Sequence, residues 1–131
     1  MRAFPIALYG GRLIVSTDRE EFQGLCAYYG DPEETVSKQD ATLAIATRFE
    51  YRKGRALYIV GNFDKNPKTQ TGTMIHELSH VAFWILQRAD VRVTPANNEA
   101  FAYLMDYLYA KVTAAMKSIR KKGSCGSEES N

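Results

Sequence analysis

Four segments of the chain have the pattern of β-strands. Two short apolar runs, at residues 6–9 and 12–16, stand on either side of Gly10 and Gly11. In two longer runs, at 41–51 and 56–63, β-branched and aromatic residues alternate with small or polar ones on either side of a basic turn that contains Gly54. Strand-like runs separated by a glycine turn are typical of β-hairpins. The pattern therefore predicts a short hairpin at the start of the chain and a longer one in its middle.

Three other segments have apolar residues at a spacing of three and four, which predicts helices. The first begins at Thr17 or Asp18, has two glutamates in its first turn and ends before Gly30. Its apolar stripe consists of Phe22, Leu25, Cys26 and Tyr29. Residues 31–40 are polar and have no clear period, so we expect a surface loop there.

Asn-Pro and Thr-Pro pairs precede the other two helices, as is usual for a cap followed by proline in the first turn. The second helix covers about residues 67–88, and the third begins near Thr94. The second is expected to bury Ile75, Leu78, Ala82, Ile85 and Leu86. The third is expected to bury Phe101, Leu104, Met105, Leu108, Val112 and Met116. The fold class is α+β, with an antiparallel or mixed sheet packed against an N-terminal, a central and a C-terminal helix.

Composition sets limits on this picture. A chain of 131 residues with 45% hydrophobic and 24% charged residues is expected to form one domain, here residues 1–118. Residues 119–131 are expected to form a basic helix end and a disordered tail, because glycine, serine and acids follow the basic cluster. The net charge of +2 does not favour nucleic acid, and no apolar run suggests a membrane or a leader. We expect a cytoplasmic protein, monomeric or weakly oligomeric.

The central helix contains the motif H-E-x-x-H, formed by His76, Glu77 and His80. Residues four apart lie on one helix face, so both imidazoles can face one ion while Glu77 reaches a water bound to it. These are the only two histidines in the chain, which makes chance placement in this pattern improbable. The spacing predicts a zinc chelate with a general base beside it.

A third ligand is expected on the following helix. Glu99 stands 19 positions after His80, which leaves room for the first helix to end and the chain to turn back. Two histidines and one glutamate are a ligand set of catalytic zinc sites, which leave the fourth position to water. We therefore expect one zinc ion per chain, held by His76, His80 and Glu99.

With Asn98-Glu99 after H-E-x-x-H, residues 67–109 resemble the gluzincins, the thermolysin-like zinc metallopeptidases. The resemblance implies a minimal zincin-like domain, similar to small phage or mobile-element metallopeptidases, with Glu77 as the general base and a peptide or protein as substrate. It also implies that the strand at 56–63 borders the cleft, so that Gly61 and Asn62 would lie beside the substrate. The alternative is that these two residues only end the strand.

The chain departs from the gluzincin pattern at two places. Larger members often have Asp four residues after the ligand Glu, where this chain has Tyr103, so either Asp106 or Tyr103 is expected to support the ligands. The chain also lacks the third histidine with which large gluzincins stabilise the oxyanion, so this role is left to Tyr103, to Tyr107 or to zinc alone with reduced efficiency. A selective or weak peptidase is therefore expected.

Two other functions are consistent with the sequence. One is a zinc-binding adaptor or interaction module that is catalytically weak or inactive. The other is a metal-free α+β interaction protein in which the motif arose by chance. Metal analysis separates the second from the others, and a Glu77→Gln substitution separates a peptidase from a binding module.

Overall fold

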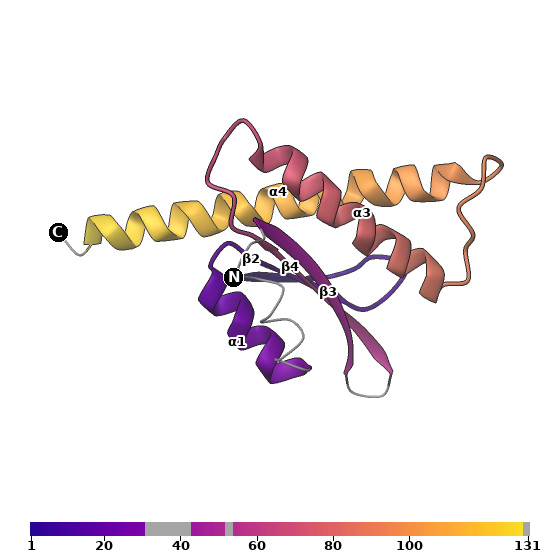
Figure 1. The fold of residues 1–131 in the computed structure, drawn as a ribbon, viewed down its shortest axis with the longest axis horizontal. Helices are drawn as coiled ribbons and strands as arrows, with labels where there is room; N and C mark the ends of the chain where they lie inside the picture. Colours follow the sequence, from indigo (N-terminus) through magenta and orange to yellow (C-terminus); the bar gives the residue numbers. More distant parts are fainter. Residues whose placement is uncertain (31–42, 52–53, 130–131) are drawn as a thin grey trace.

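A four-stranded mixed sheet forms the centre of the protein, with helices on both of its faces (Figure 1). The structure, a computed structural model, describes residues 1–30, 43–51 and 54–129. The described elements are β1 (Arg2–Pro5), β2 (Arg12–Ser16), α1 (Arg19–Tyr29), β3 (Ala44–Tyr51), β4 (Arg55–Asn62), α3 (Gln70–Arg88) and α4 (Asn98–Glu129). The α+β class expected from the sequence is confirmed. The loop expected at 31–40 lies outside the described residues.

The sheet has the strand order β1-β2-β4-β3. The outer pairs, β1 with β2 and β3 with β4, are antiparallel, as expected for hairpins. The two hairpins join through β2 and β4, which run parallel with Ile14 opposite Ile59. A parallel pair needs a long connection, and here the chain between the two strands includes α1 and β3.

The first hairpin differs from the expected one in its first strand. We expected that strand at 6–9, but β1 ends at Pro5 and residues 6–11 form a wide turn. The amide of Ile6 donates to the carbonyl of Gly11, and Leu8, Gly10 and Gly11 have φ angles of 68°, 76° and 86°. Three left-handed residues cannot continue a strand, which explains the shift. A Cβ at Gly11 would lie 2.8 Å from the carbonyl oxygen of Ala56, so this position requires glycine.

Helices α3 and α4 cover one face of the sheet, and α1 covers the other (Figure 1). The larger core, beneath α3 and α4, contains Leu78 and Leu108, both fully buried. The smaller core contains Phe22 and Cys26 of α1 against Ile59 of β4, so the predicted stripe of α1 is confirmed. Most of the positions predicted to point inward from α3 and α4 are buried or partly buried. Ile75 is the exception at 43% exposed, because Met74 and Leu78 occupy the core side of the first turns.

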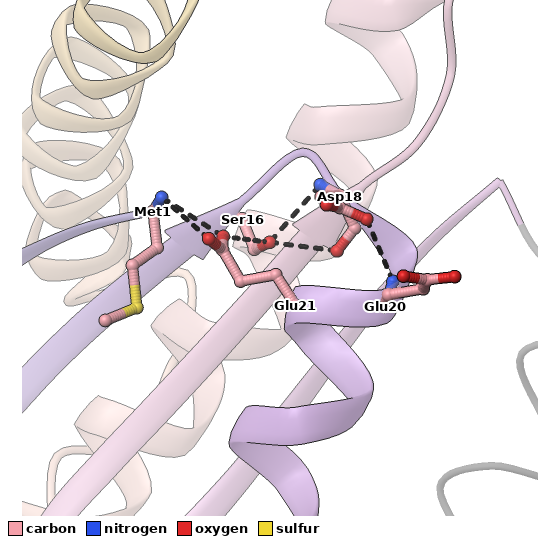
Figure 2. Close-up of polar contacts among 5 residues, drawn as sticks. All are labelled: Met1, Ser16, Asp18, Glu20 and Glu21. Carbon is pink, nitrogen blue, oxygen red and sulfur yellow. Dashed lines mark hydrogen bonds and ion pairs between the residues drawn. The ribbon is translucent and has the colours of Figure 1, made fainter. Parts of the chain in front are cut away.

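The start of α1 is held to the sheet by a small polar cluster (Figure 2). The Asp18 side chain caps the helix by accepting from the amide of Glu20, at 3.0 Å. The buried hydroxyl of Ser16, at the end of β2, donates to Glu21, whose carboxylate also pairs with the amino group of Met1 at 3.1 Å. This cluster joins β1, β2 and α1 where the chain leaves the sheet.

A second polar cluster, the Asp64 junction, connects β4 to α3. The carboxylate of Asp64 accepts from the hydroxyls of Thr69 and Thr73 at 2.7 and 3.0 Å, and from the amide of Asn66 at 2.9 Å. Asn62 adds a bond from its side chain to the carbonyl of Gln70. Helix α3 therefore starts at Gln70 rather than at Pro67, since the turn that precedes it is built around this carboxylate.

Helix α4 is longer than the sequence suggested. It continues to Glu129, through residues where a disordered tail was expected, and its C-terminal part extends beyond the sheet (Figure 1). Glycine and serine lower helix propensity by only about 0.5–1 kcal/mol each, so they do not by themselves end a helix. Among the described residues, no helix has the length and apolar character needed to cross a membrane.

Candidate metal centre

The middle of α3 brings the two histidines together. The Nε2 atoms of His76 and His80 are 3.3 Å apart, and the ring centroids are separated by 5.0 Å. Both residues are exposed. The arrangement follows from the four-residue spacing alone, since these positions lie one helical turn apart on the same face.

This distance fits a shared metal ion. Two nitrogens bound at about 2.0–2.1 Å to one tetrahedral zinc lie about 3.3–3.4 Å from each other. The same separation also allows a hydrogen bond, in which one ring donates its Nε2–H to the unprotonated Nε2 of the other. The two imidazoles therefore have the spacing of a zinc chelate without any change of rotamer.

Glu77 lies on the side of α3 that faces β3. Thr73, Glu77, His80 and Trp84 follow one another at spacings of four, three and four, so they form one stripe along the helix. The stripe ends at Trp84, whose ring stacks with His80 at 6.1 Å and lies 5.2 Å from the guanidinium carbon of Arg48 on β3. Glu77 is partly buried and stands beside the histidine pair, as the motif requires of a base.

Glu99 is not brought to the histidines. Phe101 marks the side of α4 that meets α3, because its ring lies 4.7 Å from that of Phe83. Positions two apart on a helix are separated by about 200° around its axis, so Glu99 leaves α4 on the opposite side, and it is exposed. Within the part of the chain that the structure describes, no three His, Cys, Asp or Glu side chains are grouped to hold a metal. The buried positions Leu104 and Leu108 fix this rotation of α4.

The other candidates on α4 have separate positions. Tyr103 and Asp106 share the exposed face with Glu99, as their spacing predicted, and Tyr103 is 71% exposed. The hydroxyl of Tyr107 accepts from the amide of Ala7 and donates to the carbonyl of Pro5, both at 3.2 Å. Tyr107 therefore holds the first hairpin against α4 rather than reaching the histidines.

Gly61 and Asn62 do not border an open strand edge, which corrects the expectation for them. Strand β4 is paired on both sides, with Gly61 opposite Ser16 of β2 and Ile45 of β3. Both residues are buried, and a Cβ on Gly61 would lie 2.5 Å from the ring of Phe63. Among the described residues, β3 is the strand at this side of the sheet that has a partner on one edge only.

Arg48 and Tyr58, beside the Trp84 end of α3, were missed from the sequence. Arg48 alternates with Ala46 on β3 and lies directly opposite Tyr58 of β4, on the face that α3 covers. Burial raises the pKa of the Tyr58 hydroxyl, while the charges of Arg88 and Arg48 act in the opposite direction. The available signal was an arginine at a position where alternation calls for an apolar residue.

Comparison with known proteins adds no relative. No family model, curated protein or solved structure matches the chain.

Proposed function

We propose that the protein is a zinc-dependent metallopeptidase that hydrolyses a peptide bond within an extended substrate. The observation that carries the proposal is the 3.3 Å separation of the two Nε2 atoms within an H-E-x-x-H helix. His76 and His80 supply two of the ligands. Sequence spacing and the resemblance to gluzincins assign the third to Glu99, although in the structure Glu99 lies on the side of α4 away from the histidines.

Zinc bound at such a site polarises the scissile carbonyl and lowers the pKa of a bound water to about 7. The task of Glu77 is proton transfer. Its carboxylate takes a proton from the attacking water as the water oxygen bonds to the carbonyl carbon, and gives that proton to the amide nitrogen as the C–N bond breaks. Its position beside the pair, on the side of α3 towards β3, supports this role.

Strand β3 is the element proposed to hold the substrate. An extended peptide can pair with an exposed strand through backbone hydrogen bonds while alternate side chains enter pockets. This assignment replaces the one made for Gly61 and Asn62, because β4 already has partners on both edges. A peptide paired with β3 would pass along the side of α3 that carries Glu77 and Trp84.

The alternative is a zinc-binding interaction module without turnover. The exposure of Glu99 on the far side of α4 favours it, because two histidines alone leave an incomplete catalytic ligand set. Under this reading Glu77 has no catalytic task, because the zinc-loaded parent itself has no peptidase activity.

The test combines metal analysis with hydrolysis of a quenched fluorescent peptide library by the purified chain. We expect one zinc per chain and cleavage that falls by about 10²–10⁴-fold in Glu77→Gln, with zinc retained, as is typical for loss of a general base. Glu20→Gln, at an exposed position on α1, is the matched control and should cleave like the parent. Zinc binding without cleavage would favour the interaction module, and absence of zinc would refute both.

A further inference from the structure

An open pocket of about 460 Å³ lies between the sheet and the C-terminal half of α3. Residues of β3, β4 and α3 line it. On α3 the pocket lies at the Trp84 end of the stripe that contains Glu77 and His80. The residues that carry its chemistry are Arg48, Glu50, Tyr58, Trp84, Gln87 and Arg88.

Arg48 has hydrogen-bonding capacity left in this pocket. Its Nη1 donates to Gln87 at 3.3 Å, and its guanidinium lies over the ring of Trp84. A guanidinium has five N–H donors, and among the described residues Arg48 makes no ion pair with a carboxylate. It is exposed, so a ligand can reach the remaining donors.

The charges lining the pocket leave an excess of one positive charge. Arg88 is already engaged, since it pairs with Glu50 at 2.7 Å and also donates to the carbonyl of Gly54. Two arginines against one glutamate give a net charge of +1 for the lining residues. A single carboxylate matches this excess, whereas a phosphate monoester carries about two negative charges.

The wall of the pocket also contains a buried polar group without a partner. Tyr58 is only 3% exposed, and within the described parts of the chain its hydroxyl makes no hydrogen bond. It lies opposite Arg48 in the register of β3 and β4. Buried hydroxyls normally have a partner, so a phenol that faces this pocket is an available donor for a ligand oxygen.

The pocket adjoins the histidine pair through one side chain. The ring centroid of Trp84 lies 6.1 Å from that of His80 and 5.2 Å from the guanidinium carbon of Arg48. The His80 ring and the Arg48 guanidinium are therefore at most about 11 Å apart, the length of about three residues of extended peptide at about 3.3 Å each. A peptide whose scissile bond lies at the histidines can therefore extend a carboxylate into the pocket.

We propose that Arg48 and Tyr58 form a subsite that binds one carboxylate of the substrate peptide and so selects for acidic or C-terminal residues near the cleaved bond. This inference rests on the proposed function for the position of the scissile bond. The carboxylate comes either from the C-terminus of the peptide or from an aspartate or glutamate side chain.

Trp84 makes the binding step measurable apart from catalysis. It is the only tryptophan in the chain, so its fluorescence reports on the pocket. The full chain carrying Glu77→Gln would be titrated with three acetylated alanine tripeptides: one with a free C-terminal carboxylate, its C-terminal amide, and an amide with glutamate in place of one alanine. Calorimetry would provide a second readout.

We expect a carboxylate peptide to bind at least about tenfold more tightly than the plain amide, as is typical of a charge-assisted hydrogen bond. Whichever carboxylate peptide binds more tightly identifies the source. Arg48→Gln should remove the preference, and Tyr58→Phe, which deletes only the hydroxyl, should reduce it. Arg12→Gln, on β2 outside the pocket, removes the same charge and should not alter it.

Equal binding of all three peptides, or a preference unchanged by Arg48→Gln, would overturn the proposal. Hydrolysis by the zinc-loaded parent chain separates this failure from that of the proposed function. Equal cleavage of peptides with and without the carboxylate would refute the subsite but not the peptidase activity. Tight carboxylate binding without cleavage would refute the peptidase activity but not the subsite.

Discussion

Two polar regions of α3 differ in how completely their groups are paired. At the helix start, the Asp64 carboxylate is buried and accepts three hydrogen bonds, from two threonine hydroxyls and one backbone amide. In the middle of the helix, His76 and His80 are exposed, and each has the other ring as its nearest polar partner. The carboxylate oxygens of Asp64 are bonded to other groups of the protein, whereas the exposed imidazoles of His76 and His80 are accessible to a ligand.

The Asp64 junction is therefore expected to contribute to the stability of the fold, and the histidine pair to contribute mainly to ligand binding. A satisfied buried carboxylate stabilises the fold, and its removal leaves the donors around it unpaired. Exposed imidazoles contribute little to folding, so we expect their substitution to affect ligand binding more than stability. Three experiments test this difference between the two regions.

The largest expected effect concerns metal affinity. His80→Ala removes one of the two nitrogens proposed to bind zinc, and we expect zinc affinity to fall by more than about a hundredfold, beyond the 10–100-fold loss typical of outer-shell substitutions. Competition with a chromophoric chelator measures it. Gln87→Ala is the control, because Gln87 is also exposed on α3, two turns after His80, and this variant should bind zinc like the parent. Glu99→Gln decides the third ligand, because an unchanged affinity would remove Glu99 from the site.

The next effect concerns stability. Asp64→Ala leaves the hydroxyls of Thr69 and Thr73 and the amide of Asn66 without their acceptor. We expect the melting temperature of the zinc-free protein to fall by about 4 °C or more. His80→Ala, measured by the same calorimetry, should alter the free energy of unfolding by no more than about 0.5 kcal/mol. A larger fall in melting temperature for His80→Ala than for Asp64→Ala would contradict this expectation.

The smallest effect appears in the pH dependence. The hydroxyl of Thr69, followed by the amide of Asn66, lowers the pKa of Asp64 below its usual value of 3.8. A lowered pKa in the folded state adds stability above the unfolded pKa, and this contribution is lost as the pH falls through the lower, folded value. The difference in melting temperature between the parent and Asp64→Asn should therefore be constant at pH values well above 3.8 and should shrink as the pH falls below 3.8. A difference that stays constant below pH 3.8 as well would show that ionisation of Asp64 does not contribute.

Features that depend on nearby residues were predictable from the sequence. The Asp18 cap, the stripe of α1 and the approach of His76 to His80 each involve residues within one or a few helical turns, so spacing alone determines them. The second hairpin was also predicted, since Gly54 has a φ of 76° that suits a tight turn.

Features that depend on distant packing were not predictable. The inward face of α4 was predicted, but the position of Glu99 relative to His76 and His80 was not, because it depends on how α3 and α4 pack against each other. The interior position of β4 depends on its pairing with β2, which the hairpin pattern does not indicate. The subsite around Arg48 was missed for the same reason, because only the tertiary structure brings β3 beside the end of α3.

The parallel contact between β2 and β4 has a consequence for how the chain acquires its structure. Arg12 pairs with Leu57, 45 positions later (57 − 12), whereas each hairpin closes over a short turn. Closing a long loop costs more entropy than closing a short one, and non-local pairing slows folding. We infer that the two hairpins form early and separately, and that their union into one sheet is the late step on which the final placement of α3 depends.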